Sequence, residues 1–116
     1  MKGPLSAALQ AEFRHGIALF NAGRYWDAHE AWETVWNAVE GDERLFYQGL
    51  IQAAAAMVHR QKSNAHGVRV LGTKALEKLA RFDRDHGGID VERFRRDVLL
   101  ALSGGDWPRI VPAVGD

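Results

Sequence analysis

The chain has 116 residues, a length that suits one domain and leaves little room for a second. Hydrophobic residues make up 47% and charged residues 26%, which excludes a disordered or fibrous chain. Fifteen Lys and Arg balance fifteen Asp and Glu, so the broad basic field of a nonspecific nucleic-acid-binding protein is absent. The lack of cysteine excludes disulfides, thiolate zinc sites and cysteine nucleophiles. We therefore expect a single domain over residues 1–116.

The chain carries no segment typical of a signal peptide or of a membrane span. The N-terminal region has no apolar stretch of the required kind. The longest hydrophobic run, residues 50–58, includes Gln52 and is too short to cross a bilayer. We therefore expect a cytoplasmic protein that has no membrane partner.

Apolar spacing and glycine positions divide the first half of the chain into three helices. The first is predicted over residues 5–22 and the second over residues 24–39, each ending near a glycine. The third is predicted over residues 43–62, with Asp42 as its N-cap. Apolar side chains cover most of the circumference of this third helix, so it belongs in the centre of a bundle.

The second half is predicted to contain two more helices. Asn64 is an N-cap for a fourth helix, whose apolar residues recur at spacings of three and four as far as Phe82. Residues 86–88, a histidine followed by two glycines, close that helix. Asp90 opens a fifth helix, which ends at residues 103–105.

The remaining tail, residues 103–116, is predicted to lie against the helices. Its two prolines, Pro108 and Pro112, exclude a regular helix, and its apolar residues indicate that it packs back on the bundle. No segment alternates as a β-strand. The sequence therefore predicts an all-α fold: a compact single-domain bundle of about five helices in antiparallel hairpins, without a sheet.

A short pattern in the first two predicted helices is similar to one tetratricopeptide helix pair. The residues that carry it are Gly16, Leu19, Gly23, Tyr25, Ala28 and Trp32. The pattern does not recur after the period of about 34 residues that such repeats require. Because one repeat cannot bury its own face, the likeness predicts an antiparallel helix hairpin and not a peptide-binding solenoid.

A longer resemblance covers residues 17–79. It is carried by the run FNAGRYWDAHEAWE at residues 20–33, then by Trp36, Phe46, residues 49–52, the alanine run, His59, Asn64, Gly67 and Leu71. In order and spacing these residues resemble the domain of unknown function 309 family. The resemblance implies a small all-helical protein and brings no established activity, so the chemistry must come from the residues themselves.

Polar residues form a stripe on each of two neighbouring predicted helices. His29, Glu33 and Trp36 share one edge of the second helix, and Gln52 and His59 share a polar line on the third. Antiparallel packing would bring the two stripes face to face. We therefore predict a polar pocket between these helices. Its candidate residues are His29, Glu30, Glu33, Trp36, Gln52, His59 and Trp26.

The outer members of this set have weaker assignments. Glu30 projects about 100° away from the stripe, so we expect it to be solvated or paired with a neighbouring element. Trp26 projects close to His29 and is expected to be partly exposed, whereas Trp32 is on the core side and is expected to pack.

Two interpretations of the cluster remain open. His29, Glu33 and His59 could hold a divalent metal with a position open for water, or act as an acid and base pair. Alternatively, Glu33 holds His29 through an i,i+4 contact, while His59 and Gln52 complete a buried network that fixes helix packing. The zinc-protease motif His-Glu-x-x-His is incomplete, because Glu33 stands where its second histidine would be.

We expect a non-catalytic binding or interaction module that accepts a small polar ligand or a segment of a partner protein. The alternative is a small metal-dependent hydrolase with His29, Glu33 and His59 as ligands and Glu30 or Gln52 in support. Basic residues between positions 81 and 96 alternate with acidic ones, so we do not expect nucleic acid as a partner. Self-association is left open.

Overall fold

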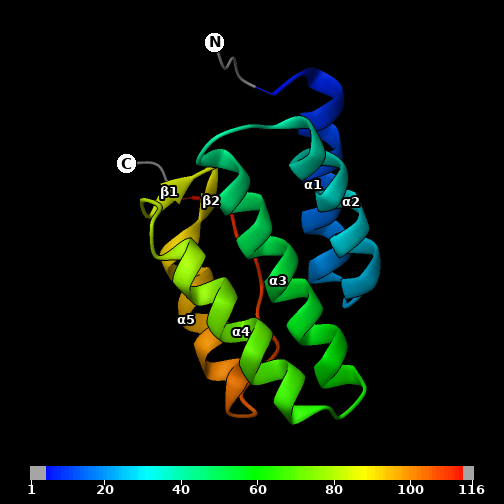
Figure 1. Cartoon of the computed structure of the whole chain (residues 1–116), viewed down its shortest axis with the longest axis vertical. Helices are drawn as coiled ribbons and strands as arrows, with labels where there is room; N and C mark the ends of the chain where they lie inside the picture. The colour runs from blue at the N-terminus through cyan, green and yellow to red at the C-terminus, as the bar shows by residue number, and fades with distance from the viewer. Residues whose placement is uncertain (1–4, 114–116) are drawn as a thin grey trace.

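The computed structural model describes residues 5–113, which form five helices and one short β-hairpin. The elements are α1 (Ala7–Asn21), α2 (Tyr25–Ala38), α3 (Glu43–Gln61), α4 (Ala65–Leu79), β1 (Asp85–His86), β2 (Ile89–Asp90) and α5 (Val91–Leu102). Helices α1 to α4 pack in chain order, each against the next, and α5 lies against α4 (Figure 1). The predicted all-α fold is confirmed, with the two-residue ladder of the hairpin as its small exception.

The three predicted N-cap positions are confirmed, and two of these residues form a capping hydrogen bond through the side chain. Asn64 and Asp90 each accept, through the side chain, the backbone N–H three residues on, at 3.1 and 2.9 Å. Asp42 makes no such bond, because it already has helical backbone angles, φ −65° and ψ −25°. The chain enters α3 through a turn at Gly41, whose φ of 67° suits glycine.

The fourth helix ends at Leu79, earlier than its apolar spacing predicts. Phe82 continues that spacing from a loop, where its ring meets Phe46 edge-on at 5.4 Å. The following Gly87 and Gly88 have φ of 63° and 77°, a pair of left-handed residues that forms the tight turn of a hairpin. The histidine and glycines predicted as a helix end are therefore part of the hairpin.

Aromatic side chains fill the core around α3, the central helix (Figure 1). Trp32 is fully buried, and its Nε1 donates a hydrogen bond to the carbonyl of Phe13 at 3.2 Å. The indole lies against Gly16, where a Cβ would come within 2.6 Å of Trp32 Cδ1. Glycine thus lets α1 and α2 approach closely. In the described range, none of the helices combines the length and apolar character needed to cross a membrane.

The tail returns along the bundle from the end of α5 to the hairpin, behind α3 in the view of Figure 1. Its attachment point is Asn21, whose Nδ2 donates to the carbonyl of Ile110 at 2.7 Å and whose Oδ1 accepts from the N–H of Ile110 at 2.8 Å. Pro108 and Ile110 are buried. Residues 114–116, the end of the predicted tail, lie outside the described range.

Candidate functional site

The His29 and Glu33 pair predicted on α2 is present at the surface. His29 Nε2 lies 3.8 Å from Glu33 Oε2, and the Glu33 side chain is 51% exposed. The imidazole stacks on Trp26, with ring centroids 5.0 Å apart and an interplanar angle of 9°. As predicted, Trp26 is exposed, at 57%. The pair therefore lies at a solvated edge, where an ion pair contributes at most about 1 kcal/mol.

His59 does not join that pair, because it packs on the α4 side of α3. A Cβ at Gly67 of α4 would lie 2.5 Å from His59 Nδ1. Asn64 Oδ1 accepts the N–H of Gly67, which leaves its amide to donate to His59 Nδ1, 3.0 Å away. The structure therefore gives this nitrogen a partner within the α3–α4 turn. Among residues 5–113, no group of three or more His, Asp and Glu side chains is arranged to hold a metal ion.

The other predicted site residues are distributed along α2 and α3. The Arg44 guanidinium lies over the ring of Trp36, 3.7 Å from its centroid. Glu30 is exposed, as predicted, and faces a groove between α1 and α2. Three buried atoms of the set have no hydrogen-bond partner in the described structure: His29 Nδ1, Trp36 Nε1 and Gln52 Oε1. Among the described residues, protein atoms therefore do not complete the buried hydrogen-bond network expected between the second and third helices. The polar pocket stays a prediction.

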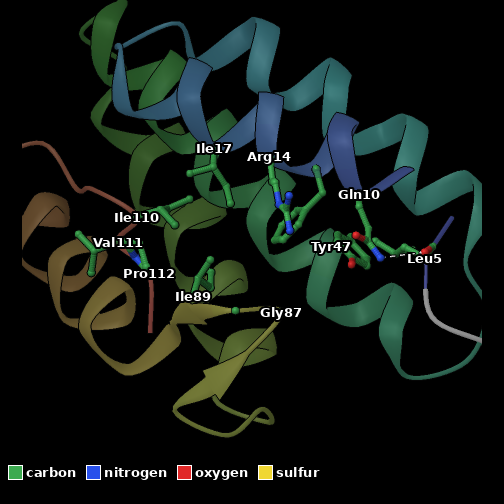
Figure 2. Close-up of a pocket in the computed structure, with 12 residues that line it drawn as sticks. Leu5, Gln10, Arg14, Ile17, Tyr47, Gly87, Ile89, Ile110, Val111 and Pro112 are labelled. Atoms are coloured by element: carbon green, nitrogen blue, oxygen red, sulfur yellow. Dashed lines mark hydrogen bonds between the residues drawn. The ribbon is translucent and has the colours of Figure 1, made fainter. Parts of the chain in front are cut away.

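A cavity lies in a different place, between α1, the start of α3, the hairpin and the tail. Its volume is about 650 Å³, within the range of small-molecule sites. We call it the tail cavity, and Figure 2 shows its walls. The lining residues are Leu5, Gln10, Phe13, Arg14, Ile17, Tyr47, Gly87, Gly88, Ile89, Ile110, Val111 and Pro112.

Backbone hydrogen bonds hold the hairpin and the tail together as the far wall of the tail cavity. The N–H of Asp90 donates to the carbonyl of Val111 at 2.9 Å, and the N–H of Ala113 donates to the carbonyl of Gly88 at 3.0 Å. Asn21 fixes the tail to the end of α1 at Ile110. The hairpin and the tail are therefore joined to each other, and the tail is joined to the end of α1.

A histidine that sequence reasoning left without a role secures the hairpin to α3. His86 Nε2 donates to both carboxylate oxygens of Glu43, at 2.7 and 2.9 Å. Its ring also meets Phe46 and Phe82, at 4.6 and 4.7 Å between centroids. The prediction that residues 86–88 close the fourth helix is thus wrong, because α4 ends at Leu79 and His86 lies on β1.

Tyr47 contributes a polar group to a wall that is mostly apolar. Its side chain is buried, with 3% of the residue exposed, and its ring meets Phe13 and Phe46 edge-on at 5.5 and 5.2 Å. The side chain is one of the residues that line the tail cavity. Burial, and secondarily the charge of Glu43, raise the pKa of Tyr47 to about 12. The phenol therefore stays protonated and can donate.

The polar residues gather at one end of the tail cavity. Figure 2 shows Arg14 and Gln10 projecting from α1 toward the side of Tyr47, with Val111 and Pro112 at the opposite end. Gln10 Nε2 donates to the carbonyl of Leu5 at 3.0 Å, which holds its amide at the rim. The cavity thus has a polar end and an apolar end.

Sequence reasoning missed the tail cavity because its walls come from four distant segments. Phe13 and Ile17 were assigned to the apolar stripe of the first helix, and that stripe does reach the cavity. The helical spacing of Gln10, Arg14 and Ile17 was an available signal, since these three residues share one face. The opposite wall depends on where the tail lies, which no local pattern reports.

Comparison with known proteins identifies a family. No curated protein matches the sequence at a significant level. The family model of the Domain of unknown function (DUF309) matches residues 13–71, which is half of the chain and includes α2, α3 and the larger part of α1. The chain therefore belongs to the DUF309 family.

Proposed function

We propose that this protein is a non-catalytic binding protein that takes a small, mainly apolar ligand in the tail cavity. The observation that carries the proposal is a walled volume of about 650 Å³, lined largely by aliphatic, aromatic and proline side chains. Sites for small molecules are typically concave, apolar and furnished with a few polar groups. The ligand differs from the small polar one expected from the sequence, because the site differs.

The chemistry of the lining supports binding without catalysis. None of the twelve lining residues is a His, Asp, Glu, Ser or Lys, the usual acids, bases and nucleophiles. The pKa of the Tyr47 phenol is raised to about 12, so the phenol does not ionise near neutral pH. Arg14 keeps its charge under all ordinary conditions. The lining therefore suits recognition of a ligand better than its conversion.

The proposal is tested by titrating the ¹⁵N-labelled protein with 1-octanol, a neutral apolar probe. We expect the amide resonances of Gly87, Gly88 and Val111 to shift in a saturable way, because these residues line the tail cavity. In Ile17→Trp an indole fills part of the cavity, so affinity falls by about tenfold or more.

The matched control is Leu99→Trp on α5, which adds the same indole at a side chain that is 57% exposed and outside the tail cavity. This variant should bind 1-octanol as the wild type does. The proposal fails if the shifts map to α5, if they do not saturate, or if Ile17→Trp binds with unchanged affinity.

A further inference from the structure

The tail cavity carries a single formal charge on its lining. Arg14 is the one charged residue among the twelve, and no Asp or Glu lines the space. No carboxylate of residues 5–113 lies within ion-pair distance of Arg14. Arg14 itself is an exposed residue of α1. An anionic group at this end of the cavity would meet a cation and no acidic side chain among the described lining residues.

The hydroxyl of Tyr47 supplies a second, independent indication. The residue is 97% buried, but its hydroxyl is not among the buried polar atoms that lack a hydrogen-bond partner. Its side chain lines the tail cavity. The phenol can therefore serve as a neutral hydrogen-bond donor to a ligand in the cavity.

We propose that the tail cavity binds a small monocarboxylic acid, with the carboxylate held by Arg14 and the Tyr47 hydroxyl and the apolar body directed toward Val111 and Pro112. This inference rests on the proposed function. A carboxylate offers two oxygens that accept from a guanidinium and can also accept from a phenol. Figure 2 places these two donors at one end of the cavity and the aliphatic wall at the other.

Other head groups fit this donor set less well. A protonated amine would meet the positive charge of Arg14 and would have no carboxylate in the lining to pair with. A phosphate dianion carries two negative charges, and Arg14 is the only cation of the described lining that could compensate them. A neutral alcohol can accept from one donor but gains no charge-assisted bond. One cation and one neutral donor therefore select a single negative charge.

The experiment compares octanoate with 1-octanol, which share an apolar body and differ in the head group. Dissociation constants are measured by calorimetry or by amide shifts for the wild type, Arg14→Gln, Tyr47→Phe and the control Arg69→Gln. Arg69 is exposed on α4 and lies outside the tail cavity. The wild type should bind octanoate more tightly than 1-octanol by about tenfold or more, the strength of a charge-assisted hydrogen bond.

The variants assign that preference to named atoms. Arg14→Gln should abolish the preference for octanoate over 1-octanol, because the charge is lost. Tyr47→Phe keeps the ring packing and should weaken octanoate by several fold. Arg69→Gln should behave as the wild type. A preference that survives Arg14→Gln would overturn the assignment.

The outcomes also separate this inference from the proposed function. If 1-octanol binds as tightly as octanoate and both are lost in Ile17→Trp, the binding site stands and the carboxylate assignment is overturned. If neither probe binds, the proposed function itself fails. An acetylated dipeptide ending in leucine is the third probe. If it binds more tightly than octanoate, the ligand is the end of a peptide chain and the small-acid assignment is overturned.

Discussion

Replacing Gly16 with alanine tests the close approach of α1 and α2. The new Cβ would lie 2.6 Å from Cδ1 of Trp32 and closer still to its Nε1. The indole cannot move freely, since it is fully buried and donates to Phe13. Overpacking costs about 1 to 3 kcal/mol. Loss of the indole hydrogen bond destabilises the protein by about 1 kcal/mol more. The higher helix propensity of alanine stabilises it by about 1 kcal/mol and so offsets part of this cost.

The net prediction is that Gly16→Ala lowers the free energy of unfolding by about 1 to 3 kcal/mol. Urea denaturation measures this change directly. Gly72→Ala is the matched control, because its Cβ would meet the Cδ2 atom of Leu102, the end of a half-buried, flexible side chain. This control should be neutral or stabilising by up to about 1 kcal/mol.

A second variant attributes the effect of Gly16→Ala to the indole. Trp32→Phe in the Gly16→Ala background removes the ring atoms that the new Cβ contacts, so the two changes should cost less together than the sum of their separate costs. The reasoning is refuted if Gly16→Ala is as stable as the wild type, or if its cost adds fully to that of Trp32→Phe.

Three further predictions concern the tail cavity. The pKa of Tyr47 rises from 10.0 to about 12 on folding, so the native state holds the phenol proton more tightly than the unfolded state does. The contribution of this group to the free energy of unfolding is therefore complete below pH 10. That free energy should fall by about 3 kcal/mol as the pH rises toward 12. Urea denaturation across that range should show a shallower fall for Tyr47→Phe, and equal slopes would contradict the assignment. Asn21→Ala removes both side-chain bonds to the tail and should cost about 1 to 3 kcal/mol, with faster proteolysis of residues 103–113 as the readout; unchanged proteolysis would refute it. Gly87→Ala should cost more than Gly88→Ala, because both have positive φ but only the Gly87 Cβ would meet Phe46, at 3.1 Å. Thermal unfolding of the two variants tests this order.

Local patterns in the sequence were enough to predict the helices. Caps such as Asn64 and Asp90 act through bonds three residues away, so their effect can be read from neighbouring positions. The same holds for the burial of Trp32 and the exposure of Trp26, which follow from their places on one helix. Asp42 occupies the predicted N-cap position of α3 but forms no side-chain capping bond, since its own backbone angles are helical.

Contacts between distant segments were beyond such patterns. The i,i+4 pair of His29 and Glu33 was predictable because helix geometry alone sets it. Whether His59 faces α2 or α4 depends on the rotation of α3 in the bundle, and the glycine at position 67 is what admits its ring on the α4 side. The partnership of His86 with Glu43 depends on a hairpin that the helical spacing up to Phe82 concealed.

The attachment of the tail affects the order in which the parts of the structure form during synthesis. Asn21 and Ile110 are 89 positions apart, so the contact that fixes the tail cavity is among the most nonlocal in the fold. During synthesis the N-terminal part of a chain emerges first. A nascent chain that has completed α5 but not residues 110–112 has most of its helical core and lacks one wall of the cavity. Ligand binding at this site would therefore distinguish fully folded molecules from those that are helical but unfinished.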